Sequence, residues 1–247
     1  PPYICTTAQA LIIGVCLNLA PAVLEAGATY GILGKLTSNY VYQGYSKSSD
    51  KPAIQGNIDV MYSPGIFAGA WISQVDFNDA RENSEASVEL SPYVGWRHSI
   101  SDIWSIDIGL LGYIYDGEVN GREANYGELT GRLYFRDLLT GQIAISHDAF
   151  GTDNTIYDFE LLGRFPLTDV LDASASVGYS HASRVFEYNN LYWSIGATWF
   201  LHRYAAIDLR YYASRHVGSE PEEAAESEYV ELPDIENHFV VSISIGY

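Results

Sequence analysis

Apolar and polar residues alternate along most of this chain, and the pattern is clearest in its last segment, NHFVVSISIGY, residues 237–247. Apolar or aromatic side chains stand at every second position there: Phe239, Val241, Ile243, Ile245 and Tyr247. Small or polar residues fill most of the other positions, with Val240 as the exception. Because successive side chains of a strand point to opposite faces, this alternation predicts a strand with one apolar and one polar face.

Eleven further segments show the same alternation. Together with the last one, they predict strands over 30–42, 54–62, 67–77, 86–97, 104–110, 128–135, 139–146, 157–165, 171–180, 191–199, 207–212 and 237–247. Tilted strands of about 10 residues are long enough to cross the hydrocarbon core of a bilayer. The backbone groups of such strands are all paired only if the sheet closes on itself.

The connections between these strands alternate between short and long. Short connections lie near positions 63, 99, 136, 166 and 201, whereas the others are longer and polar, such as SKSSDKP at 46–52. Up-and-down membrane barrels have tight periplasmic turns and longer outer loops. We therefore predict an all-β fold, a 12-stranded antiparallel up-and-down transmembrane β-barrel in the outer membrane of a Gram-negative bacterium. A soluble β-sandwich or a lipocalin-like barrel is the alternative.

Aromatic residues are abundant, with 20 Tyr, 9 Phe and 5 Trp. Membrane barrels place aromatic girdles at both lipid–water interfaces, in contact with lipid and lipopolysaccharide. The residues that we expect to anchor the barrel in this way are Tyr40, Tyr62, Trp71, Phe77, Trp96, Trp104, Phe135, Trp193, Trp199 and Tyr247. The last strand, with its terminal aromatic residue, is also the expected signal for the barrel-assembly machinery.

The charge of the chain restricts its partners. The formal net charge is −18, and much of the acidic excess lies in one stretch, 218–236, which we interpret as a solvated loop. This balance argues against binding to nucleic acid, whose phosphates require Lys and Arg. The two cysteines, Cys5 and Cys16, both lie near the start of the chain, so the rest has no disulfide framework and no thiolate metal site.

The first residues differ from the rest in composition. The run AQALIIGVCLNLA, residues 8–20, is apolar but too short to span a bilayer comfortably. We predict a signal peptide over 1–26 and the barrel over 27–247. A retained apolar segment that acts as a plug or anchor is the alternative for 1–26.

Three stretches, SNYVYQGYSKSSDKPAIQGNIDV (38–60), GIFAGAWISQVDF (65–77) and NYGELTG (125–131), resemble the TorF or Gcw-type family of proteobacterial porins. The shared features are a Ser-Asn-Tyr-Val run from Ser38, Gly-x-Ser from Gly44, Pro-Ala-x-Gln-Gly from Pro52 and Gly-x-Trp from Gly69. Gln43 stands where an Arg is common in that family, and Asn57 where a second Gly is common. The resemblance implies an outer-membrane location and a channel, but no particular substrate.

If the apolar parity faces lipid, the polar parity faces the lumen. The residues that we expect to line the pore are Lys35, Gln55, Asn57, Asp59, Glu89, Arg97, Asp107, Glu128, Arg132, Asp158, Glu160, Arg164, Asp208 and Arg210. Asp158, Glu160 and Arg164 share one strand face, which suggests a hydrated ionic network. Acidic residues outnumber basic ones among the inward positions, so the field of an open lumen favours cations. We therefore predict a passive channel for small solutes with a preference for cations.

Two other kinds of function remain possible on the sequence. A barrel enzyme that acts on lipid needs a nucleophile and a base at the rim, and the local pairings are His147 with Asp148 and Ser180 with His181. Neighbours in a strand face opposite sides, so neither pairing is assigned a role, and we predict no catalytic residue, metal or cofactor. A closed barrel that binds a partner through its loops is the other alternative. Its lumen would be filled by long side chains.

Overall fold

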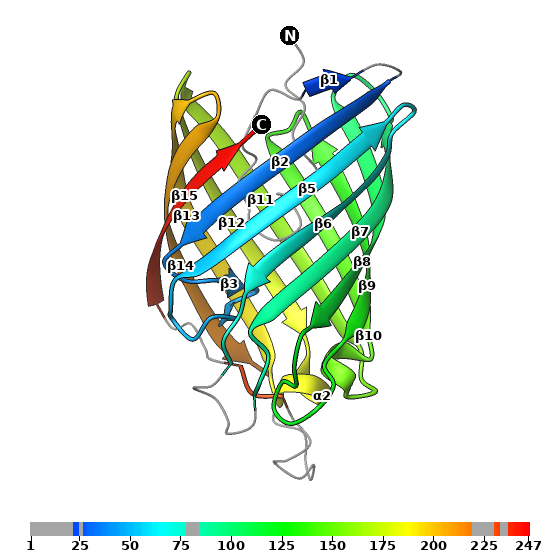
Figure 1. The fold of residues 1–247 in the computed structure, drawn as a ribbon, viewed down its shortest axis with the longest axis vertical. Helices are drawn as coiled ribbons and strands as arrows, with labels where there is room; N and C mark the ends of the chain where they lie inside the picture. The colour runs from blue at the N-terminus through cyan, green and yellow to red at the C-terminus, as the bar shows by residue number, and fades with distance from the viewer. Residues whose placement is uncertain (1–21, 25–26, 78–83, 219–229, 233–236) are drawn as a thin grey trace.

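Twelve antiparallel strands form a closed barrel within the residues that the computed structural model describes, which are 22–24, 27–77, 84–218, 230–232 and 237–247 (Figure 1). The strands are β2 (Ala28–Thr37), β5 (Ala53–Tyr62), β6 (Ile66–Gln74), β7 (Val88–Ser99), β8 (Trp104–Tyr115), β9 (Tyr126–Phe135), β10 (Leu139–His147), β11 (Ile156–Thr168), β12 (Leu171–His181), β13 (Asn189–His202), β14 (Ala205–Val217) and β15 (Asn237–Gly246). Each of these strands pairs with its neighbours in sequence, and β2 pairs with both β5 and β15. The predicted all-β, up-and-down barrel is therefore confirmed.

Pairing between the first and last barrel strands closes the sheet. The register runs from Ser242 opposite Thr37 to Gly246 opposite Leu33. Beyond it, the amide of Tyr247 donates to the carbonyl of Ile32 at 2.8 Å, and the amide of Ile32 donates back at 2.9 Å. The short strand β1 (Ala22–Leu24) pairs with the start of β2. The rest of the predicted 1–26 segment lies outside the described residues.

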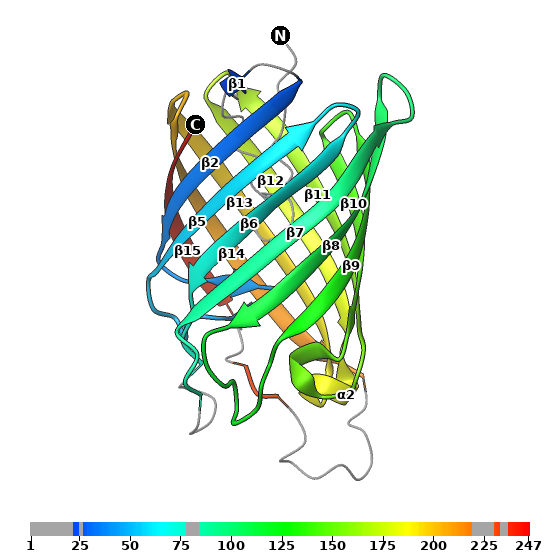
Figure 2. The ribbon, with the colours of Figure 1, turned by 45° about the vertical axis from the view of Figure 1, so that its right-hand side comes forward.

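Short turns and long loops lie at opposite ends of the barrel, as predicted. Figures 1 and 2 place the C terminus and the short turns at one end, which we call the turn end. The longer connections lie at the other end, the loop end, and include the short helices η1 (Ala149–Gly151) and α2 (Ser183–Phe186). In the described part of the chain, no helix combines the length and the apolar composition needed to cross a membrane.

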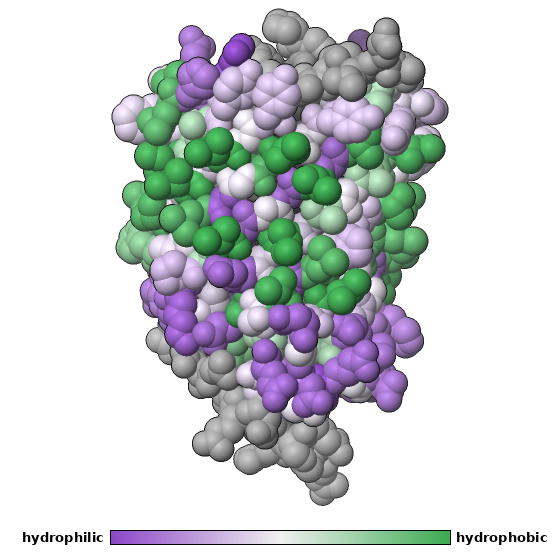
Figure 3. Space-filling view, viewed as in Figure 1, coloured by the Kyte–Doolittle hydropathy of each residue, from purple (hydrophilic) through white to green (hydrophobic). Residues whose placement is uncertain are grey.

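The outer surface of the barrel is apolar around its middle. Large hydrophobic side chains such as Ile58, Leu110 and Ile195 are strongly exposed, at 60%, 59% and 61%. Figure 3 shows apolar residues as a band across the middle of the visible face, between two more polar ends. A soluble sandwich or lipocalin-like barrel would bury such faces against each other or around a ligand. The outward apolar band instead matches the hydrocarbon core of a membrane, which places the protein in the Gram-negative outer membrane.

The prediction for the start of the barrel is wrong in one respect. The first strand does not continue to residue 42 but ends at Thr37, and the following segment turns into the barrel. There it forms a small hairpin of β3 (Val41–Tyr42) and β4 (Tyr45–Ser46). Residues 46–49, which we expected in an outer loop, are therefore buried. The turn is possible because Gln43 and Gly44 adopt positive φ angles of 49° and 85°.

The predicted orientation of the third barrel strand is also wrong. In β6, Phe67 and Trp71 face the interior and are almost fully buried, whereas Ala68 and Ala70 have the opposite parity. The lipid-facing positions are taken by Ile66 and Ile72. Both parities of this segment are apolar enough to face lipid, so alternation alone cannot choose between them. The interior accepts the larger rings because this part of it is aromatic.

Candidate functional site

All fourteen predicted pore-lining side chains lie on the inward parity of their strands. Gln55, Asn57, Glu89, Asp107, Glu128, Arg132, Asp158, Asp208 and Arg210 are buried, and Lys35, Asp59, Arg97, Glu160 and Arg164 are partly exposed. Burial within a barrel wall places these groups in the lumen rather than in lipid. That they line a conducting path stays a prediction.

Asp107 is the centre of an ionic cluster on β7, β8 and β9. Its carboxylate accepts a hydrogen bond from Arg97 Nη2 at 2.7 Å and another from the Tyr134 hydroxyl at 2.8 Å. Arg132 Nη1 lies 3.6 Å from the other carboxylate oxygen, and Arg132 Nε donates to Gln142 at 2.7 Å. One buried carboxylate therefore neutralises two guanidinium groups in part, which fixes side chains from four strands.

Two further ion pairs lie on the strands from β11 to β14. Arg210 donates to Asp208 at 3.1 Å and to Ser174 at 2.8 Å. Arg164 donates twice to one oxygen of Asp172, at 2.6 Å and 2.7 Å. The proposed network of Arg164 with the acids of its own strand is therefore wrong, because Asp172 faces it from the neighbouring strand.

Four inward carboxylates take part in no ion pair within the described ranges: Asp59, Glu128, Asp158 and Glu160. Glu128 accepts hydrogen bonds from Ser146 at 3.0 Å and from Tyr42 at 3.4 Å. Asp158 interacts electrostatically with both Glu128 and Glu160, and the side chains of Ser180 and Gln43 lie next to its carboxyl group. Glu128, Asp158 and Glu160 thus form a group of three acidic side chains without an ion pair on β9 and β11, which we call the acidic patch.

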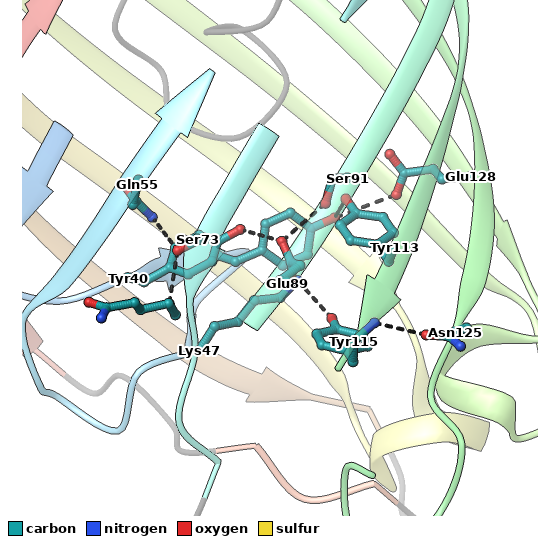
Figure 4. Close-up of polar contacts among 12 residues, drawn as sticks. Tyr40, Lys47, Gln55, Ser73, Glu89, Ser91, Tyr113, Tyr115, Asn125 and Glu128 are labelled. Atoms are coloured by element: carbon teal, nitrogen blue, oxygen red, sulfur yellow. Dashed lines mark hydrogen bonds and ion pairs between the residues drawn. The ribbon is translucent and has the colours of Figure 1, made fainter. Parts of the chain in front are cut away.

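The inward hairpin contributes a buried lysine that the sequence did not single out. Lys47 Nζ lies 2.6 Å from Glu89 Oε2, and both side chains are fully buried. Figure 4 shows this ion pair among tyrosines of the hairpin and of the barrel wall. The ammonium lies 4.3 Å from the ring centre of Tyr42 and 4.5 Å from that of Tyr113.

Two more tyrosines complete the surroundings of this ammonium. The ring centres of Tyr40 and Tyr115 lie 5.7 Å and 5.8 Å from Lys47 Nζ. Tyr40 donates to Glu89 at 2.9 Å, and Lys47 donates to the Tyr115 oxygen at 3.2 Å. Burial, and next the charges of nearby carboxylates, raise the pKa of the Tyr40 and Tyr42 phenols well above their usual range, so both stay neutral. We call Tyr40, Tyr42, Tyr113, Tyr115 and Glu89 the ammonium cage.

The tip of the hairpin reaches the opposite wall of the barrel. Asn190 Nδ2 on β13 donates to the carbonyl of Gln43 at 2.8 Å. Ser214 on β14 donates to the carbonyl of Gly44 at 3.1 Å. The hairpin starts from β2 and is held by β7 and β8 through the cage, so it crosses the lumen from one wall to the other.

Aromatic and aliphatic side chains surround the hairpin at the loop end. Tyr45 packs against Phe186 of α2 with ring centres 4.9 Å apart, and Phe150 of η1 lies 5.6 Å from Phe186. Val230 and Leu232 belong to the same buried cluster. These two residues are part of the acidic 218–236 stretch, most of which lies outside the described residues. At least this part of the stretch is therefore packed into the protein rather than solvated.

The ten predicted anchoring aromatics fall into two groups. Tyr62, Trp96, Trp104, Phe135, Trp193, Trp199 and Tyr247 lie on the outward parity, where their anchoring role stays a prediction. The prediction is wrong for Tyr40, Trp71 and Phe77, which are 1%, 2% and 0% exposed. Their rings fill the interior beside the hairpin, where burial in protein replaces contact with lipid.

The pairings considered for catalysis do not come together. Ser180 is buried in the lumen, whereas its neighbour His181 is exposed on the other face of β12. His147 is exposed, and its Nδ1 lies 3.2 Å from the hydroxyl of Thr155. Across the described ranges, no three His, Cys, Asp or Glu residues are grouped so as to hold a metal ion.

Sequence reasoning missed Lys47 because it stands in a polar run that looks like an outer loop. A signal was nevertheless present on the strands. Tyr113 and Tyr115 alternate with Ile114, which is apolar and faces lipid, so these tyrosines had to face inward. A ladder of inward tyrosines predicts an aromatic filling of the lumen at that level, and such a filling requires a partner segment.

The comparisons with known proteins agree with this fold. A family model described as "Bacterial protein of unknown function (Gcw_chp)" matches residues 25–235. A search of curated proteins gave no match. The solved KdgM porin is similar with a TM-score of 0.52 at 8% sequence identity, over 88% of this chain and 99% of that chain.

Two further solved structures are similar to the same degree. The KdgM porin in complex with disordered oligogalacturonate has a TM-score of 0.53 at 7% identity, over 89% of this chain and 99% of that chain. The NanC porin has a TM-score of 0.51 at 9% identity, over 87% of this chain and 98% of that chain. At such low identity these likenesses show the fold alone. The family match confirms the Gcw part of the resemblance, whereas its description contains neither the TorF name nor a function.

Proposed function

The chain belongs to the Gcw_chp family, and from this premise and its porin fold we propose that it is an outer-membrane channel for small solutes. The channel is passive and has no enzymatic activity. Among solutes we propose a preference for cations, with the β3–β4 hairpin as the constriction. The similarity of the barrel to the KdgM and NanC porins supports the proposed channel, and the charges of the lumen support its preference for cations.

The acidic patch is the observation that carries the preference for cations. Each described inward base except Lys35 has a carboxylate partner, namely Lys47, Arg97, Arg132, Arg164 and Arg210. Because Arg97 and Arg132 share Asp107, four carboxylates remain against Lys35 and one uncompensated guanidinium charge, so acidic groups are still in excess. Carboxylates that line a narrow lumen of low dielectric raise the local concentration of cations and repel anions.

A salt-gradient experiment tests this proposal directly. The full chain is reconstituted in a planar bilayer with a gradient of KCl, and the reversal potential is measured. We expect a potential of cation-selective sign. A potential of anion-selective sign would overturn the preference, and the absence of current at any voltage would overturn the channel.

Two substitutions with a matched control test whether the acidic patch causes the preference for cations. Asp158→Asn and Glu160→Gln each remove one inward carboxyl group with little change in shape, so we expect each to shift the reversal potential towards zero. The control is Asp137→Asn, which removes a carboxyl group at an exposed turn between β9 and β10. An equal shift in the control would assign the selectivity to surface charge instead.

A closed barrel is the second candidate, because the loop end is well filled. Lys47, Glu89, Tyr45 and Tyr113 are all 0% exposed within the described residues. A barrel whose hairpin never moves would serve as a scaffold for partners that bind its loops. It would insert into the bilayer normally but show no single-channel steps in any salt.

Contacts outside the lumen follow from the orientation of the barrel. We propose that the loop end faces lipopolysaccharide in the outer leaflet, with divalent cations between lipid phosphates and loop carboxylates. We also propose that the barrel-assembly machinery recognises β15, whose apolar side chains alternate up to Tyr247. Cross-linking from an exposed position on β15, such as Phe239, to the assembly machinery during insertion tests the second proposal.

A further inference from the structure

The ammonium cage has the composition of a binding site for an organic cation. Quaternary and primary ammonium groups are recognised by the faces of several aromatic rings within about 6 Å. Lys47 Nζ meets this condition at all four tyrosines, at 4.3 Å, 4.5 Å, 5.7 Å and 5.8 Å. Glu89 supplies the negative charge on the remaining side, at 2.6 Å.

The occupant of this cage belongs to the chain, but the cage is built from two separate bodies. Tyr113 and Tyr115 on β8 and Glu89 on β7 belong to the barrel wall. Tyr40 and Tyr42 enter with the hairpin, which also brings Lys47 itself. The ammonium group therefore supplies the ion pair between the hairpin and the wall, beside the hydrogen bonds of Tyr40 with Glu89 and of Tyr42 with Tyr113, and any group that replaces it there breaks that ion pair.

The groups that form the cage determine which kind of ion can take the place of the Lys47 ammonium. Ca²⁺ and Mg²⁺ require shells of several oxygen ligands, whereas this cage offers one carboxylate and four ring faces. Anions are repelled by Glu89 and by the negative ring faces. An alkylammonium group fits, because its charge meets Glu89 and its methylene groups can lie against the rings.

We propose that the ammonium cage is a binding site for organic amine solutes, whose ammonium group displaces that of Lys47 and releases the hairpin from the barrel wall. This inference rests on the proposed channel and names its solutes as organic amines. The acidic patch gives such solutes an approach, because Glu128 is linked to the cage through the Tyr42 hydroxyl. In the absence of an amine, the Lys47–Glu89 ion pair acts together with the contacts of the hairpin tip to hold the hairpin across the lumen.

The first test compares amine and sodium in the unmodified protein. Channel current in planar bilayers is measured while NaCl is replaced by propylammonium chloride at constant ionic strength. We expect the open fraction to rise several-fold and to saturate. Tyr113→Leu removes one ring face and abolishes the rise, whereas Tyr113→Phe keeps the ring and preserves it. A current that ignores propylammonium, or is only blocked by it, overturns the inference.

The second test examines the cage by itself. Lys47→Ala removes the atoms of one propylammonium ion and leaves the rings and Glu89 in place. In detergent micelles, added propylammonium should raise the thermal unfolding midpoint of this variant by several degrees, and propan-1-ol of similar size should not. Lys51→Ala is the matched control, because Lys51 pairs with Asp76 at 2.8 Å on the exposed side of the same segment. No rise in Lys47→Ala, or an equal rise in Lys51→Ala, contradicts the inference.

The two tests separate this inference from the channel on which it rests. If the protein conducts KCl but neither test responds to propylammonium, the channel stands and the amine site fails. If Lys47→Ala is stabilised while no variant conducts in any salt, the cage binds amines but the channel fails, and release of the hairpin fails with it. If Lys47→Ala does not insert, the current of the unmodified protein still decides the inference.

Discussion

At the scale of single residues, Gly44 determines how closely the hairpin approaches the far wall. Its φ of 85° lies in the left-handed region, and a Cβ atom there would lie 2.6 Å from Asn190 Nδ2 and 2.7 Å from Ser214 Cβ. Gly44→Val therefore combines backbone strain with two collisions. We expect a loss of about 1–3 kcal/mol in the free energy of unfolding, measured by urea in micelles, and a larger open fraction in bilayers.

A second glycine provides the control for this prediction. At Gly141 on β10, a Cβ atom would meet no heavy atom within 4 Å, and φ is not in the left-handed region. Gly141→Val should leave both the stability and the open fraction nearly unchanged, because Val suits a strand. Equal effects of the two substitutions would show that the hairpin tip does not depend on close contact with β13 and β14.

At the scale of elements, β15 combines two tasks at the same edge of the sheet. It closes the barrel against β2, and Tyr247 adds two backbone hydrogen bonds to Ile32 beyond the strand. Its ring also lies 5.5 Å from that of Tyr204 on the turn between β13 and β14. Deletion of Tyr247 should lower the yield of inserted barrel several-fold, while the barrels that do insert keep their single-channel conductance.

The matched variant for this deletion is Tyr247→Phe. It keeps the backbone pairing and the ring and removes only the hydroxyl, so insertion should remain near the level of the unmodified protein. Heat-dependent mobility of the folded barrel on gels measures the inserted fraction. Normal insertion of the deletion variant would remove β15 from the proposed contact with the assembly machinery.

The elements also show how far the sequence could predict this fold. The strands were predictable because lipid requires an apolar residue at every second position, and β15 obeys this rule from Phe239 onward and β8 from Trp104 to Leu110. No such rule applies inside the lumen, where Trp71, Glu89 and Tyr113 are equally acceptable if they have partners. The hairpin and the orientation of β6 therefore depended on long-range packing, for which alternation carries no information.

The same reasoning explains how much of the candidate site could be predicted from the sequence. Individual inward acids and bases could be assigned by parity alone. Their ion-pair partners could not be assigned in this way. Arg164 could contact Glu160 on its own strand or Asp172 on the next strand, and the register between β11 and β12 decides which of the two it meets. Lys47 lies on no barrel strand, so the ammonium cage emerges only when the hairpin is placed against β7 and β8.

At the scale of the whole molecule, the two surfaces of the barrel have opposite chemistry. Outward side chains are apolar, whereas the lumen contains ion pairs, the acidic patch and the ammonium cage. In water this arrangement would expose a continuous hydrophobic band. In a bilayer the band matches lipid, and the lumen keeps the charged groups away from it.

Substitutions can test how deeply each part of the outer surface lies in the membrane. Leu110 and Ile100 are equally exposed, at 59% and 58%, but Leu110 lies in the middle of β8 and Ile100 in the turn between β7 and β8. An arginine at the midplane of a membrane barrel costs about 2–4 kcal/mol, and one near the interface about 0–1 kcal/mol. Leu110→Arg should therefore destabilise the barrel in phospholipid vesicles far more than Ile100→Arg, as measured by urea unfolding. In water both arginines would be solvated and their effects would be small and similar, so equal losses would show that lipid does not surround the apolar band.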